Sequence, residues 1–260
     1  MIKFKKVLPS DPAIEKALVV VGCPGIGLVG KNAVTEICSE LHADKWVEIY
    51  FDDFPSQAII EKNGMMTIPS AQLYYKALPR KEGVDFDLLI LTSDFQPMNS
   101  TGIYEFADEI CKFLQQAVKE VMMVVATGAL VPDCVPEKAF VHVSGTHLNA
   151  IQSFVNLESG LCKLMDGGFI SGANGIIPAW CGIHYNMPSI SLLAETIPML
   201  KTDPRASRAI ILALNERFGL EIPTDSINVK VEQMEEMLSS LRENETGEEK
   251  ESGPSQSYIG

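Results

Sequence analysis

The sequence has no uninterrupted apolar run as long as the roughly 18 residues that a membrane-spanning helix needs. Its charged start, residues 1–6, leads into Pro9 and not into the apolar core of a signal peptide. Basic residues are also scarce, because 21 Lys and Arg stand against 34 Asp and Glu, a formal net charge of −13. Nucleic acids and anionic lipids both require a basic surface. We therefore expect an intracellular, cytoplasmic protein that binds neither nucleic acid nor membranes.

Several chemical signatures are missing as well. The chain contains no P-loop, no G-x-S-x-G and no H-E-x-x-H motif. It has no C-x-x-C pair either, and its six cysteines lie mostly in apolar stretches, at positions 23, 38, 111, 134, 162 and 181. We expect these cysteines to be reduced core residues and not a disulfide framework. Cys181 and His184 have the spacing of half a zinc site, but no second half accompanies them.

One stretch, residues 17–30, organises the rest of the chain. Its first part, Ala17 to Val21, is aliphatic and β-branched, as expected of a strand buried on both faces. Four glycines follow at once, at positions 22, 25, 27 and 30. Apolar residues then recur at helical spacing from Leu28 to Leu41. The pattern predicts a strand, a glycine turn and a helix, which is how a parallel α/β domain begins.

The glycine turn has two interpretations. Gly25, Gly27 and Gly30 spell G-x-G-x-x-G, and Glu48 and Asp52 follow at about the distance of a ribose-binding carboxylate. This pattern is typical of dinucleotide binding. Glycines at a tight strand-to-helix turn also allow a helix to pack closely on a sheet, and no substrate-side motif accompanies them. We favour the packing role and keep a dinucleotide- or nucleoside-binding enzyme as the alternative.

The remaining elements alternate between strands and helices. Further strands are predicted at residues 2–7, 46–51, 86–91, 121–126, 140–143 and 189–193. Helices are predicted at residues 103–117, 148–155, 174–184 and 204–218, the last between the Asp203 cap and the Gly219 stop. Thr127 and Gly128 are expected to end the strand before them. Right-handed crossovers then give a three-layer α/β fold with a largely parallel sheet and helices on both faces.

A hairpin interrupts this alternation. Residues 57–62 and 65–75 flank Asn63-Gly64, a dipeptide that tolerates the positive φ angles of a type I′ turn. We expect this hairpin to project from the sheet and to contact a partner.

The C-terminal part divides into a helix and a polar tail. The domain organisation is therefore an α/β core at residues 1–225, an amphipathic helix at 226–242 and a disordered acidic tail at 243–260. An apolar seam is spaced by heptads along the helix, at Ile227, Val231, Met234, Leu238 and Leu241. It suits packing in an oligomer and packing back onto the core equally well.

Two further sets of residues are candidates for catalysis. Cys23 stands at a helix entrance, where a thiolate is favoured, but a base would have to come from His142, His147 or His184, far along the chain. Carboxylates follow the ends of predicted strands, where α/β sheets bind ligands, at Asp52, Asp53, Asp94 and Glu195. Such carboxylates also cap helices and solvate loops. We expect a packed thiol and structural carboxylates.

Four stretches together resemble the proteasome assembly chaperone family, specifically archaeal homologues of its second eukaryotic member. They are GCPGIGLVG (22–30), GANGIIPAW (172–180), SISLLAET (189–196) and DPRASRAIILAL (203–214). The resemblance, over residues 15–240, implies a protein that is not an enzyme and has a nucleoside phosphorylase-like fold. It also implies a homo-oligomer that binds α-subunits of the proteasome core particle, with no cofactor or metal.

The resemblance further implies a docking tail. In that family a C-terminal motif of hydrophobic residue, tyrosine and any residue enters pockets between α-subunits. This chain ends Ser257-Tyr258-Ile259-Gly260, so its tyrosine is third from the end and follows a serine. Independently, an aromatic residue at the end of a polar segment buries nothing in its own chain and is available to a partner. Tyr258, Ile259 and Gly260 are the predicted contacts; the alternative is a frayed end without a role.

Overall fold

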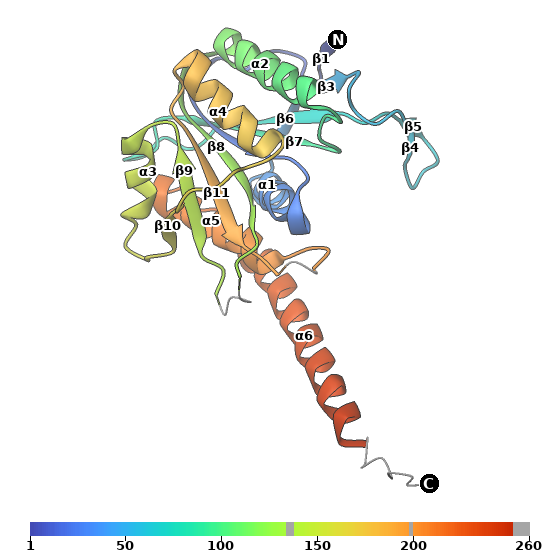
Figure 1. The fold of residues 1–260 in the computed structure, drawn as a ribbon. Coiled ribbons are helices and arrows are strands. Elements are labelled where there is room, and N and C mark those ends of the chain that lie inside the picture. The colour runs from blue at the N-terminus through green and yellow to red at the C-terminus, as the bar shows by residue number, and fades with distance from the viewer. Residues whose placement is uncertain (134–137, 198–199, 252–260) are drawn as a thin grey trace, which may run out of the picture.

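A nine-stranded sheet forms the middle of the molecule, in the order β1-β3-β6-β7-β2-β8-β11-β9-β10 (Figure 1). The computed structural model describes residues 1–133, 138–197 and 200–251, with side chains up to residue 239. The strands of the main sheet are β1 (Ile2–Lys6), β2 (Ile14–Gly22), β3 (Asp44–Phe51), β6 (Ala71–Lys76), β7 (Asp87–Ser93), β8 (Val118–Leu130), β9 (Val141–Gly145), β10 (Cys162–Leu164) and β11 (Ser189–Glu195). The helices are α1 (Val29–Glu40), α2 (Ser100–Ala117), α3 (Leu148–Val155), α4 (Ala173–Tyr185), α5 (Pro204–Phe218) and α6 (Asp225–Glu251), with a short 3-10 turn at Ile26–Leu28.

The central strands β7, β2, β8 and β11 run parallel to one another. Their aliphatic residues are covered on both faces, which is why they form unbroken apolar runs in the sequence. The expected end of a strand at Thr127 and Gly128 was wrong, because β8 continues to Leu130. Thr127 is tolerated there because its hydroxyl donates to the carbonyl oxygen of Val21 at 2.8 Å.

Both flanks of the sheet contain antiparallel pairs. On one side β6 pairs antiparallel with β7, β3 with β6, and β1 with β3; on the other, β9 pairs antiparallel with β11. The three-layer α/β fold is confirmed, and its sheet is mixed. The parallel pattern stops at the flank because α1 leads into β3, which is separated from β2 by β6 and β7.

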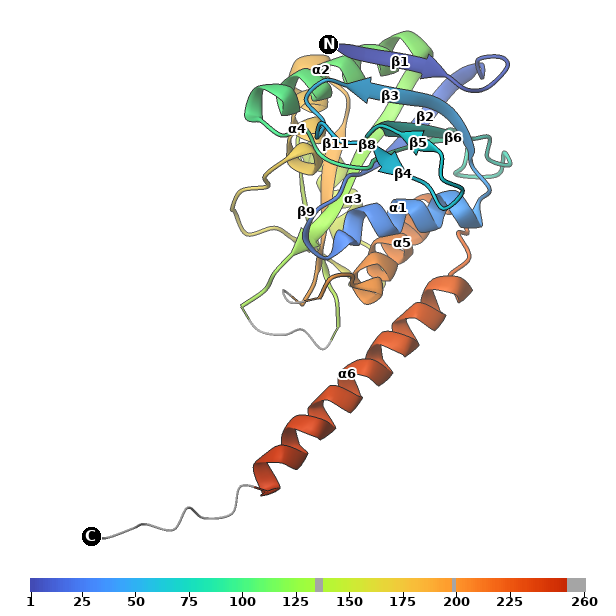
Figure 2. The ribbon, with the colours of Figure 1, turned by 90° about the vertical axis from the view of Figure 1, so that its right-hand side faces the viewer.

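Helices cover the two faces of the sheet (Figure 2). Apolar side chains of α1, α3 and α5 form one core with one face, and those of α2 and α4 form a second core with the other. Helix α5 begins and ends as the sequence predicts. The Asp203 carboxylate caps it by accepting from the backbone N–H groups of Arg205 and Ala206, and Gly219 ends it in a left-handed conformation with φ of 62°.

A hairpin is present, as β4 (Ile59–Ile60) and β5 (Met66–Thr67), and it projects from the body (Figure 1). It is shorter than predicted, because residues 71–75 of its expected second strand belong to β6 and pair with β3 and β7 of the main sheet. The predicted type I′ turn at Asn63-Gly64 was wrong. The N–H of Gly64 donates to the carbonyl of Glu61, and the N–H of Glu61 donates to the carbonyl of Met65. Only Gly64 of the dipeptide has a positive φ, at 82°. The strands are therefore joined by a three-residue loop, residues 62–64, with one left-handed glycine. The register pairs Ile60 with Met66 and so brings residues 61 and 65 opposite each other, which leaves one residue more than a two-residue turn needs.

Two further findings differ from the sequence predictions. Cys111 of α2 and Cys181 of α4 form a disulfide, so the expectation that all cysteines are reduced was wrong. Spacing gave no signal, because the fold brings together two helices whose cysteines lie 70 residues apart. Helix α6 continues to Glu251, past the predicted end at residue 242, into a glutamate-rich stretch with good helix propensity. Among the described helices, none is long and apolar enough to cross a membrane.

Candidate partner-binding surfaces

The glycine turn is shaped by close packing of backbone on backbone. A Cβ atom on Gly30 would lie 2.2 Å from the carbonyl oxygen of Thr127, and one on Gly22 would lie 2.4 Å from the carbonyl oxygen of Gly30. Distances this short leave no room for any side chain. These two glycines therefore allow β2, α1 and β8 to approach one another, which is the packing role favoured from the sequence.

The start of α1 is packed against the start of α5. Gly27 and Leu28 both have a left-handed conformation, with φ of 58° and 49°. The N–H of Asp203 donates to the carbonyl of Gly27, and the fully buried Asp203 carboxylate accepts from the hydroxyl of Thr196. The same carboxylate pairs with the Arg205 guanidinium at 3.3 Å, so contacts within the chain itself join the turn to the start of α5.

A groove of about 320 Å³ opens beside the turn, which we call the glycine-turn groove. Its lining comes from the turn itself, the end of β8 with Val131, four residues before α4 (Met165, Phe169, Ile170 and Ser171), and Gln96, Asn174 and Leu193. None of these described lining residues is charged. The side-chain amide of Asn174 accepts from the backbone N–H of Cys23 at 2.8 Å and donates to the carbonyl of Cys23 at 3.0 Å. Gln96 accepts from the N–H of Ala173 and donates to the carbonyl of Pro24. The groove is thus largely apolar, and its lining offers no charged side chain to a nucleotide phosphate.

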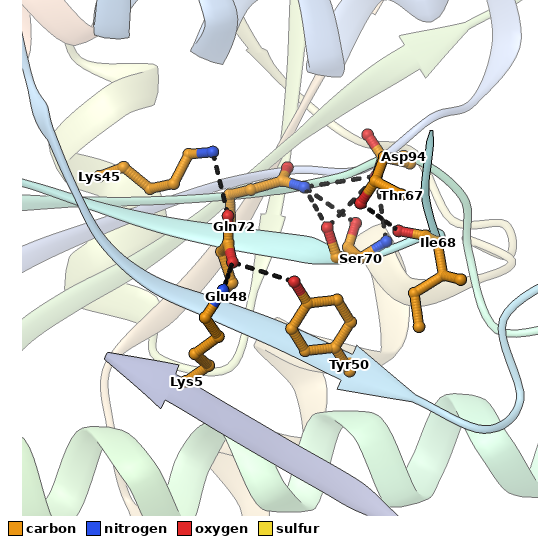
Figure 3. Close-up of polar contacts among 9 residues, drawn as sticks. All are labelled: Lys5, Lys45, Glu48, Tyr50, Thr67, Ile68, Ser70, Gln72 and Asp94. Atoms are coloured by element: carbon orange, nitrogen blue, oxygen red, sulfur yellow. Dashed lines mark hydrogen bonds and ion pairs between the residues drawn. The ribbon is translucent and has the colours of Figure 1, made fainter. Parts of the chain in front are cut away.

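The two carboxylates considered for ribose binding do not lie in this groove. Glu48 is on β3, and two strands, β6 and β7, separate β3 from β2. The Glu48 carboxylate accepts from Lys5 and from the hydroxyl of Tyr50 at 3.0 Å each (Figure 3). The hydrogen bond from Lys5 holds the pKa of Glu48 below its usual value. Asp52 forms an ion pair with the N-terminal ammonium group of Met1 at 3.2 Å.

The candidate nucleophile Cys23 is buried. Its desolvation raises the pKa of the thiol to about 11, so the thiol stays protonated at neutral pH. The three histidines have other contacts. His142 pairs with Glu195 at 2.8 Å, His147 contacts the Thr146 hydroxyl, and the ring of His184 lies 3.8 Å from that of Trp180. None of these contacts involves the Cys23 thiol.

The half zinc site and the strand-end carboxylates also have structural partners. Cys181 is bonded to Cys111, and the described residues contain no cluster of three or more metal-ligating side chains. Asp53 accepts from the N–H of Asn99 at the start of α2. Asp94 accepts from Ser70, and Glu195 from the N–H of Phe140 besides pairing with His142. The described part of the chain thus uses these candidate catalytic groups for packing and capping.

The seam of α6 is partly buried within the chain itself. Ile227, Val231 and Met234 are buried, and Leu238 is half-buried, whereas the side chain of Leu241 lies outside the described part. The first turns of α6 pack on α5, and Lys230 of α6 pairs with Glu36 of α1 at 2.5 Å. Beyond this contact α6 extends away from the body (Figures 1 and 2). The first turns of α6, up to Met234, which we call its root, are thus packed on the core of the same chain.

The predicted tail contacts, Tyr258, Ile259 and Gly260, lie outside the described residues.

The hairpin is the second exposed feature. We call residues 55–69, between Pro55 and Pro69, the arm. Four large apolar side chains on it are more than half exposed: Ile60, Met65, Met66 and Ile68. Contiguous exposed apolar side chains of this kind mark interaction sites.

A family model described as the PAC2 family matches residues 19–242. The chain belongs to the PAC2 family. Its structure is similar to that of Pyrococcus furiosus PbaB, described as an archaeal proteasome activator. The TM-score is 0.81 and the identity 29%, over 92% of this chain and 98% of that one. It also resembles P. furiosus PbaA, an archaeal homolog of proteasome-assembly chaperone, with TM-score 0.73 and 24% identity over 95% of this chain and 94% of that one. Methanocaldococcus jannaschii MJ1210 is 25% identical over 245 residues, 93% of this chain and 90% of that protein.

These comparisons confirm the resemblance inferred from the glycine turn and the three later stretches. Sequence reasoning missed several residues that shape the surfaces, namely Asn174, Lys230 and Glu36. Asp94 was considered as a strand-end carboxylate, but its contact with Ser70 was not predicted. Asn174 lies within the GANGIIPAW stretch, so its position was noticed but its contact with Cys23, 151 residues away, was not. Lys230 and Glu36 lie 194 residues apart and have no shared local pattern.

Proposed function

We propose that this PAC2 protein is an assembly chaperone or adaptor that binds α-subunits of the proteasome core particle as a homo-oligomer in the cytoplasm. The observation that carries the proposal is the similarity to PbaB, described as a proteasome activator, over 92% of this chain at 29% identity. Sequence and structure agree over nearly the whole length of both chains, so the similarity is not limited to a shared core.

The geometry of α6 supports docking through the C-terminus. Helix α6 has 27 residues, which corresponds to a length of about 40 Å. It extends away from the body, and Tyr258, Ile259 and Gly260 follow it in the sequence (Figure 2). The end of α6 that precedes them therefore lies far from the core, at a position open to a second protein complex. The tyrosine ring supplies apolar area and a polar hydroxyl for a small pocket.

An oligomer strengthens such weak contacts. A tail of three residues binds weakly alone, but several tails on one oligomer make each later docking event intramolecular. The gain is about 100-fold or more when the spacing of the tails matches that of the pockets. A multimeric form is for this reason part of the proposed mechanism.

A role without catalysis fits the chemistry of the described residues. Cys23 is a buried thiol whose pKa burial raises to about 11, and the strand-end carboxylates have structural partners. The glycine-turn groove has no charged lining residue among those described. A binding protein needs none of these groups to be reactive.

The test is binding to purified core particles by the full chain and by a chain trimmed of residues 257–260. We expect the trimmed protein to bind at least tenfold more weakly and to keep the same mass in light scattering. The matched pair Tyr258→Ala and Ser257→Ala separates the ring from its neighbour, since only the tyrosine variant should lose affinity. Equal binding by the full and trimmed chains would refute the docking tail. No association of the full chain with core particles or free α-subunits would refute the proposed function itself.

A further inference from the structure

The arm is held rigidly at its base. The Asp94 carboxylate accepts from the backbone N–H of Ser70 at 3.0 Å and from its hydroxyl at 3.4 Å, while the N–H of Asp94 donates back to the Ser70 carbonyl (Figure 3). At the other end Phe54 is buried against the rings of Phe51 and Phe106. Two anchored ends fix the points at which the arm leaves the sheet and returns to it.

Beyond this base, no hydrogen bond or ion pair joins the arm to the rest of the described residues. Its two strands have two residues each, and an isolated hairpin of this size is marginal in water. Met66 is 74% exposed and Ile60 is 72% exposed, and these two residues face each other in the strand register. An apolar pair at the tip of an anchored hairpin is arranged to enter a hollow on another surface.

Charge indicates which partner fits. The chain has a net charge of −13, so two copies repel each other except where both present uncharged surface. The arm carries one Glu and one Lys, at positions 61 and 62, whose charges cancel, and from Asn63 to Tyr75 the sequence contains no charged residue. The net charge of the arm is therefore zero, so a second copy of this chain can approach it without net electrostatic repulsion.

The same chain offers a matching hollow. The glycine-turn groove has no charged lining residue among those described, whereas the other described grooves each include Lys, Arg or Glu side chains. Apolar side chains surround it, and Phe169 among them is fully exposed, as is about half of Ile26. Because the arm and the groove lining are both exposed, the arm does not fill the groove of its own chain.

We propose that the arm of one copy packs into the glycine-turn groove of a second copy, with Met66 and Ile60 against Phe169 and Ile26. The contact joins two different patches, so it is heterologous, and repeating it builds a ring if the rotation closes. The proposal rests on the proposed function only for the expectation of a homo-oligomer.

The experiment measures mass by light scattering, in the absence of core particles, for the full chain and two charge-inserting variants. Met66→Asp disables the arm, and Phe169→Asp disables the groove; both side chains are exposed, so neither substitution disturbs the core. We expect the unaltered chain to be multimeric and each variant to be a single chain. Leu148→Asp, at an equally exposed site on α3, is the matched control and should keep the full mass.

Mixing the two variants gives the decisive measurement. The Phe169→Asp chain keeps its arm and the Met66→Asp chain keeps its groove, so a mixture can form one intact contact. We expect the mixture to reach twice the mass of one chain and to stop there. A mixture that stays monomeric, or a Phe169→Asp variant of full mass, would mean that the arm does not enter this groove, and a Met66→Asp variant of full mass would mean that the arm serves another partner. Any of these results overturns the proposal, as does a monomeric unaltered chain, and none of them measures proteasome binding.

Discussion

Lys230 of α6 donates to the carboxylate of Glu36 in α1 at 2.5 Å, joining residues 194 apart in the sequence. Glu36 is almost fully buried, and its other oxygen, Oε1, has no hydrogen-bond partner among the described residues. The Lys230 ammonium is thus the group that neutralises this carboxylate, and it stands on the helix that leads to the C-terminus. The pair ties the root of α6 to the core.

Removing this cation should destabilise the fold. Lys230→Met leaves the Glu36 carboxylate buried and uncompensated, while the methionine keeps the apolar stem. Because Lys230 itself is half exposed, we expect a loss of about 2 kcal/mol in the free energy of unfolding, below the range for fully buried pairs. Urea denaturation measures this loss. Lys119→Met is the control, because its partner Glu15 is exposed and the loss should stay below about 0.5 kcal/mol.

The glycine turn offers a test of packing against ligand binding. Gly30→Ala would place a methyl group 2.2 Å from the Thr127 carbonyl oxygen, so we expect about 3 kcal/mol of destabilisation. Gly25→Ala is the matched control from the same motif. Its nearest neighbour, the Asn174 amide nitrogen, would be 3.7 Å away, so its stability should change by less than about 0.5 kcal/mol. Thermal unfolding of both variants checks this, and equal stability would contradict the packing role.

The Cys111–Cys181 disulfide should stabilise the contact between α2 and α4. It closes a loop of about 70 residues, for which loop-closure entropy gives about 4 kcal/mol. We expect reduction to lower the urea midpoint of the unaltered chain and to leave that of a Cys111→Ala/Cys181→Ala variant unchanged. Cys38→Ala is the control and should respond to reduction like the unaltered chain. Alkylation of both cysteines in unfolded, unreduced protein, read by mass spectrometry, would show that the bond is absent.

Asp108 predicts a pH dependence of stability. Its carboxylate accepts from Tyr185 and Trp180 of α4 and pairs with Lys112 at 2.8 Å. Lys112, then Tyr185 and Trp180, lower the pKa of Asp108 to about 2. A lowered carboxylate pKa contributes stability above the unfolded pKa near 3.9, and this contribution is lost as the pH falls through about 2.

Asp108→Asn should therefore cost about 1 kcal/mol at pH 7, allowing for solvent screening of the half-exposed Lys112. The difference from the unaltered chain should shrink between pH 4 and pH 2. Urea denaturation at pH 7, 4 and 2.5 measures it, with the exposed Glu15→Gln as control. A difference that stays constant down to pH 2.5 would argue against a lowered pKa.

Local signals predicted much of the fold from the sequence. The helix at Leu148–Val155 begins and ends where its apolar periodicity does, and α5 lies between its Asp203 cap and Gly219 stop. The strand and helix around the glycine turn were predicted for the same reason. These features depend on neighbouring residues only.

Features that depend on residues far apart in the sequence were not predicted. The antiparallel placement of β3, the Cys111–Cys181 bond and the approach of Gly30 to Thr127 all follow from tertiary contacts. For the candidate surfaces, the sequence predicted the hairpin but neither the hydrogen bonds from Ser70 to Asp94 that fix its base nor the groove assembled from several separate segments. The local sequence pattern carries no information about such tertiary contacts.

The stiffness of α6 makes it a lever. A coil of the same length would absorb small rotations at its root, whereas a helix transmits them to its far end. The helix runs about 36 Å from Ile227 to Glu251, so a tilt of about 10° at Ile227 moves Glu251 by about 6 Å, slightly more than the rise of one helical turn. Any rearrangement of the contacts that Ile227, Val231 and Lys230 make with the core would thus change the position of the far end of α6.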